Sequence, residues 1–246
     1  METLAEYLNG ALDVHEAARQ LTAPITDTGD HDELWYLWCL LIPVLVNESP
    51  DREKTMDLIA AIASLPPKPR LNWQQFPEFW FTWGEHYLGH MIGYEHWERK
   101  PFSQERLAKR RESYLASDSA ASALYLRGLS VTAEWGYCAF SVVSWERPGI
   151  EVFLGQIYAW LSAASGRLKQ DLRSGEAAQF IGKDGQITAM MEEHWERWAK
   201  ELLALSEEGS DLPEYGRSMA RACYRYLLTD TQHGNDEFKH AGARWT

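Results

Sequence analysis

Apolar residues recur along this chain at steps of three and four, which is the spacing of one face of an α-helix. No stretch of the sequence alternates between apolar and polar positions for long enough to predict a β-strand. We therefore expect an all-α protein that folds as a single compact, bundle-like domain of about eight helices. The predicted helices lie near residues 3–21, 34–46, 51–65, 72–99, 103–116, 118–144, 150–175, 187–205 and 214–228. The fourth of them starts between Asn72 and Pro77, and a start at Pro77 would make Phe76 an entry residue that precedes the helix.

Breaks in this pattern divide the chain into three parts. Residues 1–33 hold a weakly amphipathic helix and a loop rich in Thr, Asp, Pro and Gly, which we expect to pack on the main domain. Residues 34–228 form the helical domain. Within it, Pro43 is expected to kink its helix, and residues 180–185 are expected to form a loop. Residues 229–246 form a polar C-terminal tail.

One predicted helical face carries no aliphatic residue. From residue 76 to residue 97, the positions at steps of 3, 4, 3, 4, 4 and 3 are all aromatic or imidazole. They are Phe76, Phe79, Trp83, His86, His90, Tyr94 and Trp97. At about 100° per residue these positions share a narrow sector that faces inward. This stripe is either an unusual packed core or one wall of a pocket, and both interpretations stay open.

A pocket at the stripe would offer acid–base chemistry in an apolar setting. Histidine titrates near neutral pH, and burial among aromatic rings shifts its pKa further. The candidate catalytic residues are His86, His90, Tyr94 and Glu134. The candidate ligand-binding residues, expected to form aromatic walls, are Trp83, Tyr87, Trp97, Trp135 and Trp160. Such walls suit a hydrophobic or aromatic molecule and can stabilise developing positive charge.

The two histidines of the stripe also have the i, i+4 spacing of a helical metal site. Glu85 and His96 lie nearby in sequence but off that face, and no third ligand stands out. The sequence contains no nucleophile elbow, phosphate-binding loop or dinucleotide fingerprint. We therefore predict no metal and no cofactor.

Composition supports a ligand site without requiring one. The chain has 12 Trp, 11 Tyr and 8 Phe among 246 residues. Trp and Tyr carry polar groups that need a partner when buried, so they suit binding sites and interfaces as well as cores.

Charge argues against one class of partner. The net charge of −12 would repel a phosphate backbone, which disfavours nucleic acid binding. The one basic cluster comprises Arg106, Lys109, Arg110 and Arg111, and we interpret it as a solvated helix face.

Several features predict a cytoplasmic protein without a membrane span. The N-terminus lacks the features of a signal peptide, and the longest strongly apolar run, residues 34–46, is too short to cross a bilayer. Cys39, Cys138 and Cys223 are far apart and each lies in an apolar run, so buried reduced thiols are expected.

The order of several landmarks resembles a family of uncharacterised helical proteins common in filamentous fungi. The landmarks are Trp35, Leu65-Pro66, Trp73, Phe76-Pro77, Trp83, residues 124–140, 157–161 and 164–166, and Trp195 to Lys200. The resemblance covers about residues 34–228. The aromatic and histidine density of residues 83–97 departs from the family pattern, as does the lack of a Trp-Asn-Leu-Asn type segment after them.

The resemblance implies an all-helical, intracellular protein of fungal type, but it carries over no activity and no site residue. Some relatives lie among genes of small-molecule biosynthesis, which by analogy favours a small apolar ligand.

Two hypotheses of function follow. In the first, the protein binds and converts a hydrophobic or aromatic small molecule of secondary-metabolite type. The chemistry would be that of a cofactor-independent cyclase, isomerase or dehydratase. In the second, it is a non-enzymatic protein-interaction domain, with Trp195, Trp198 and Lys200 on an exposed face. The spacing of Trp195, Trp198 and Leu202 equally fits a core face, and a homo-oligomer is left open.

Overall fold

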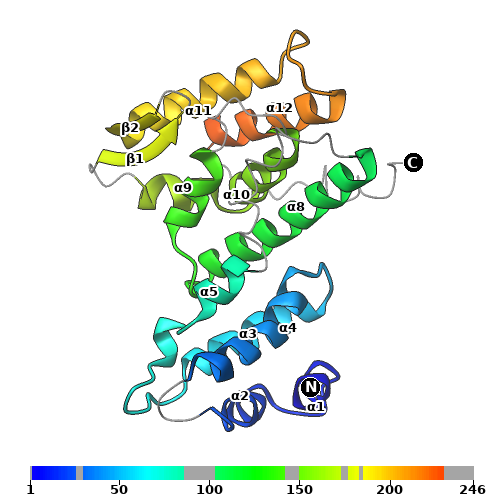
Figure 1. Ribbon diagram of the computed structural model, residues 1–246, viewed down its shortest axis with the longest axis vertical. Helices are drawn as coiled ribbons and strands as arrows, with labels where there is room; N and C mark the ends of the chain where they lie inside the picture. Colours follow the sequence, from blue (N-terminus) through cyan, green and yellow to red (C-terminus); the bar gives the residue numbers. More distant parts are fainter. Residues whose placement is uncertain are drawn as a thin grey trace. The chain divides into compact units, whose positions relative to one another are not determined.

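The computed structural model describes residues 2–25, 30–85, 103–141, 150–172, 177–182 and 185–229. This part of the chain is predominantly helical, as expected, with ten α-helices, one short 3-10 helix and one two-stranded hairpin (Figure 1). Contacts group the chain into two compact units. Unit 1 comprises residues 1–94 with 127–130, and unit 2 comprises residues 95–126 with 131–246. The expected domain over 34–228 spans residues of both units, and its boundaries stay a prediction.

The first predicted helix of unit 1 is in fact two helices, α1 (Glu2–Leu8) and α2 (Val14–Thr22). Gly10 has a φ of 77°, a left-handed conformation that glycine adopts without steric cost and that ends α1. The carboxylate of Asp13 then accepts hydrogen bonds from the backbone N–H groups of His15 and Glu16. This N-cap starts the second helix, so the expected single helix over 3–21 is wrong.

Helices α3 (His31–Val46) and α4 (Asp51–Ala63) lie where the apolar pattern placed them. Pro43 lies inside α3, and the helix continues past it to Val46. The Arg52 guanidinium donates to the carbonyls of Leu45 and Val46, which satisfies backbone acceptors at the end of α3. Arg127 reaches back to α4 and pairs with Glu53 and Asp57.

The stripe helix begins later than its spacing indicates. A 3-10 turn, η1 (Trp73–Gln75), ends at Phe76, and both Phe76 and Glu78 have left-handed backbone angles. Helix α5 (Phe79–Trp83) starts after them. Phe76 therefore precedes the helix, although its ring still contacts that of Trp38 at a centroid distance of 6.4 Å. Residues 86–102, which carry the rest of the stripe, lie outside the described part.

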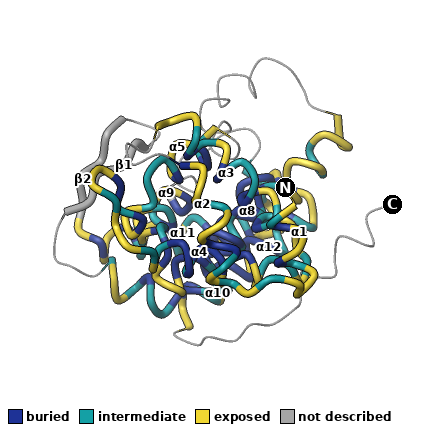
Figure 2. The backbone as a smooth tube through the Cα atoms, turned by 90° about the horizontal axis from the view of Figure 1, so that it is seen from below, coloured by how far each residue is buried: buried dark blue, intermediate teal, exposed yellow. Residues whose placement is uncertain are grey.

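Unit 2 is built around α10 (Ile150–Asp171), which is buried along most of its length (Figure 2). It packs against α8 (Gln104–Leu126), α9 (Ala133–Ser141) and α12 (Glu214–Leu228). Helix α11 (Met191–Leu205) covers α12. The expected inward positions of α10 are all buried: Phe153, Ile157, Trp160, Ala164 and Leu168.

The helix boundary expected near residues 116–118 is wrong. Helix α8 runs through it without a break, because Asp118 turns its carboxylate toward α10 instead of capping a new helix. The break comes later, at a turn in which Gly128 and Ser130 have φ values of 71° and 49°. The expected long helix over 118–144 is therefore divided between α8 and α9.

The loop expected over 180–185 and the helix start expected at 187 are also wrong. Strands β1 (Ala177–Gly182) and β2 (Gly185–Met190) pair antiparallel, with Phe180 opposite Ile187. Helix α11 follows directly, and the Met190 backbone N–H donates to the Glu193 carboxylate at its first turn. Each strand has only six residues. An alternating pattern this short does not stand out in the sequence between two long segments with helical spacing.

The cysteines differ from the expectation of three buried thiols. Cys223 is buried, Cys39 is half-buried and Cys138 is exposed, and none of the three forms a disulfide. The basic cluster on α8 is exposed at Arg106, Lys109 and Arg110, as expected of a solvated face. No helix among the described residues is long and apolar enough to cross a membrane.

Candidate functional site

Four of the nine predicted site residues lie in the described part of the chain. His86, Tyr87, His90, Tyr94 and Trp97 lie outside the described residues. Trp83 lies in unit 1, whereas Glu134, Trp135 and Trp160 lie in unit 2. Their joint role in one site stays a prediction from sequence.

Trp83 and Trp160 are packed inside their units. Trp83 is 2% exposed and contacts the Phe79 ring at a centroid distance of 5.7 Å. Trp160 is fully buried, and a Cβ at Gly136 would lie 3.0 Å from its ring. This close approach explains why α9 carries a glycine at that position.

Glu134 and Trp135 lie on the first turn of α9, where Glu134 is exposed and Trp135 is half-buried. Although Cys138 is exposed as a residue, the atoms packed around its thiol desolvate the sulfur and raise its pKa, and the Glu134 charge raises this pKa further. A raised pKa keeps this thiol protonated and unreactive near neutral pH.

The indole of Trp160 belongs to a buried polar centre that sequence reasoning did not identify. Asp118 on α8 accepts hydrogen bonds from the Trp160 indole at 2.9 Å, the Gln156 amide at 2.9 Å and the Ser117 hydroxyl at 3.3 Å. Burial raises the pKa of Asp118 to about 6, against its three hydrogen bonds, which lower it. Because these three donors are side chains of α8 and α10, the centre fastens the two helices together.

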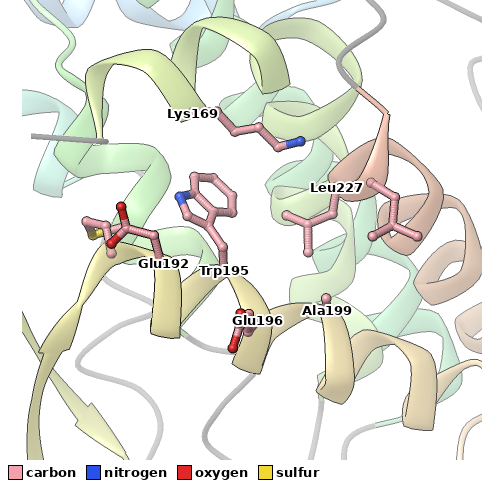
Figure 3. Close-up of a pocket in the computed structure, with 8 residues that line it drawn as sticks. Lys169, Glu192, Trp195, Glu196, Ala199 and Leu227 are labelled. Carbon is pink, nitrogen blue, oxygen red and sulfur yellow. The ribbon is translucent and has the colours of Figure 1, made fainter.

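A groove of about 390 Å³ lies between the C-terminal parts of α10 and α12 and the first half of α11. We call it the α11 groove. Its apolar lining comprises Met191, Trp195, Ala199, Leu227 and Leu228, and its charged lining comprises Lys169, Glu192 and Glu196. Side chains from all three helices converge on the same space in Figure 3. A groove of this volume is within the range of small-molecule sites.

Trp195 connects the groove with an aromatic cluster behind it. Its ring lies 5.0 Å from that of Trp198, nearly perpendicular, and 5.6 Å from that of Phe140 on α9. Tyr137 completes the cluster through an edge contact with Trp198 at 5.6 Å. Trp198 is 1% exposed, so of the two tryptophans considered for an exposed interaction face, only Trp195 reaches the surface.

Three polar groups of this cluster have no hydrogen-bond partner in the described part of the chain. They are the indole nitrogens of Trp195 and Trp198 and the hydroxyl of Tyr137. Burial raises the pKa of Tyr137 to about 12, so its hydroxyl stays protonated. Buried donors without partners are rare in packed cores, and their concentration beside the groove distinguishes this region from the Asp118 centre.

The positive charge of the groove lies on α10 and its negative charges lie on α11. Lys169 extends from α10 over the apolar floor near Leu227 (Figure 3), and Glu192 and Glu196 lie one turn apart on α11. The ammonium of Lys169 can pair with an anionic group of a bound molecule. The lysine and both leucines escaped sequence reasoning because they belong to helices far apart in the chain. The sequence singled out Trp195 for an exposed interaction face or a core face, but not for a groove.

No group of three or more His, Cys, Asp or Glu side chains among the described residues is placed to hold a metal ion. The histidine pair of the stripe lies outside that part.

Comparison of the chain with protein-family models, with curated proteins and with solved structures finds no match. The resemblance to a fungal helical family therefore stays a prediction from the sequence, and the case for a function depends on the α11 groove itself.

Proposed function

We propose that this protein binds a hydrophobic small molecule that bears a carboxylate, with the apolar body of the ligand in the α11 groove and its carboxylate at Lys169. The observation that carries the proposal is the groove itself: a volume of about 390 Å³ with five apolar side chains and a single cationic one. Burial of apolar ligand surface would supply most of the affinity, and the ammonium would select the charge of the ligand.

The aromatic cluster supports this proposal. Trp195 is held by rings on both α9 and α11, so its exposed face is a rigid wall that loses little freedom on binding. The proposal also agrees with the hydrophobic ligand class expected from the sequence.

Conversion of a hydrophobic small molecule is a separate proposal, which rests on the sequence alone and not on the α11 groove. His86, His90, Tyr94 and Glu134 would act as acids and bases in a cofactor-independent cyclase, isomerase or dehydratase reaction. Of these four, only Glu134 lies in the described part, exposed on α9.

Calorimetric titration with two matched probes tests the binding step. We expect 2-naphthoic acid to bind the full chain more tightly than its neutral methyl ester. Lys169→Met, which keeps most of the apolar stem of the side chain but removes its charge, should weaken naphthoate binding about five- to ten-fold and leave the ester unchanged. Ala199→Phe should fill the groove and abolish binding of both probes.

Lys200→Met is the matched control, because Lys200 lies on α11 but does not line the groove. Its naphthoate affinity should equal that of the wild type. The proposal fails if Lys169→Met and Ala199→Phe both bind naphthoate normally. If the double variant His86→Ala/His90→Ala loses binding instead, the ligand site lies at the stripe and not at the groove.

A further inference from the structure

An exposed aromatic surface occurs in unit 1, on α3 and α5. Tyr36 is 68% exposed, Trp80 is 53% exposed and Phe81 is 48% exposed. We call these three side chains the α3–α5 aromatic surface. Helix α5 directs Phe79 and Trp83 into the core, at 1% and 2% exposure, and leaves the two aromatic residues between them in solvent. Large rings left exposed beside a well-packed core mark a binding surface more often than a packing requirement.

Two carboxylates, those of Glu78 and Glu85, lie beside this aromatic surface. Glu78 Oε2 lies 2.9 Å from His31 Nδ1, and the His31 ring contacts that of Phe81 edge to face at a centroid distance of 5.2 Å. On the next turn, the indole of Trp35 donates to Glu85 at 2.8 Å, and the Trp35 ring contacts that of Tyr36 at 5.2 Å. Glu78 and Glu85 are therefore held in place beside the rings of the surface.

The charge of the two segments is one-sided. Residues 30–46 and 78–85 contain five acidic residues and no lysine or arginine. The acidic residues are Asp30, Asp32, Glu33, Glu78 and Glu85. Aromatic faces beside carboxylates favour cations, because the ring quadrupole and the negative charges attract the same group.

We infer that the α3–α5 aromatic surface binds an arginine-rich segment of a partner protein. A guanidinium group can stack on an exposed ring while its N–H groups pair with a neighbouring carboxylate, which an ammonium cannot do with the same geometry. The charge complementarity of the surface, with Glu78 and Glu85 held beside its rings and no lysine or arginine in either segment, identifies this occupant. The surface is in unit 1 and the α11 groove is in unit 2, so variants of one serve as controls for the other.

Fluorescence anisotropy with labelled dodecapeptides tests this inference on the full chain. We expect a peptide of alternating Arg and Ala to bind more tightly than the Lys–Ala peptide, and a Glu–Ala peptide not to bind. Trp80→Ala/Phe81→Ala should weaken Arg–Ala binding about ten-fold or more, because truncation of exposed anchors removes both stacking and contact area. Glu85→Gln should weaken it by a smaller factor, and raising the salt concentration should reduce the wild-type affinity.

Leu203→Ala is the control, because Leu203 is a large exposed apolar residue on α11 in unit 2. It should leave peptide affinity unchanged. The inference is overturned if the Arg–Ala peptide does not bind, or if it binds Trp80→Ala/Phe81→Ala as well as the wild type. Sedimentation of the free protein adds a further decision: if the wild type self-associates and this double variant does not, a second copy of the chain is the occupant. Protection of Trp80 from iodide quenching in the free monomer would show that the chain covers the surface itself, which also overturns the inference.

Discussion

Two tryptophans of unit 2 have opposite environments. The indole N–H of Trp160 donates to a carboxylate, and its ring is enclosed by α8, α9 and α10. The indole N–H of Trp195 has no partner in the described residues, and its ring lines a groove. The first arrangement pairs the indole N–H and fills the space around the ring, which is what a structural core requires. The second does neither, and this incomplete packing is why we assign binding to the groove and structure to the Asp118 centre.

The largest effect should come from truncating the enclosed ring. Trp160→Ala is expected to lower the free energy of unfolding by about 3–5 kcal/mol, since it opens a cavity and leaves Asp118 without one donor. Trp195→Ala should lower it by less than half as much, because that ring is already partly exposed. Urea unfolding followed by circular dichroism measures both. Equal losses would show that the two environments do not differ as described.

The second-largest effect should be a pH dependence of stability that distinguishes the Asp118 centre from the α11 groove. Burial raises the pKa of Asp118 to about 6 in the folded protein, from an ordinary value of 3.8. Between these values the folded state holds more protons than the unfolded state, so stability falls as the pH rises from 3.8 to 6. The loss is at most about 3 kcal/mol, from 1.36 kcal/mol per pH unit.

Asp118→Asn removes this titration while keeping an oxygen acceptor for the Trp160 indole. Relative to the wild type, the variant should therefore gain stability between pH 4 and pH 7, measured by urea unfolding at each pH. A constant difference between the two proteins over that range would contradict the raised pKa.

The smallest effect concerns the unpartnered indole. Trp195→Phe should change the free energy of unfolding by no more than about 0.5 kcal/mol, because the lost N–H group makes no hydrogen bond. Trp160→Phe, in contrast, should cost about 1.5–3 kcal/mol, because it removes a donor to a buried carboxylate. Thermal unfolding of the two variants in parallel gives the comparison. A substantial loss in Trp195→Phe would indicate a hydrogen bond at that nitrogen and would argue against the groove as an incompletely packed site.

The sequence by itself determined the helical class, and it located α3, α4, α10 and α12 closely. Helical periodicity is a local property: residues three and four apart share a face whatever that face contacts. The inward positions of α10 were therefore predictable without knowledge of its neighbours. For the same reason Trp198 could be assigned to a core face, although an exposed face remained an alternative.

Only the tertiary structure decided the features that depend on partners far along the chain. The sequence predicted a helix boundary at residues 116–118, yet α8 continues through it, and Gln156 and Trp160 on α10 donate to the Asp118 carboxylate. The α11 groove needs residue 169 beside residues 191–199 and 227–228, a meeting that no local pattern encodes. Periodicity specifies which way a side chain points relative to its own helix, whereas packing between helices specifies what it meets there. Packing between helices is therefore what distinguishes the enclosed Trp160 from the groove-lining Trp195.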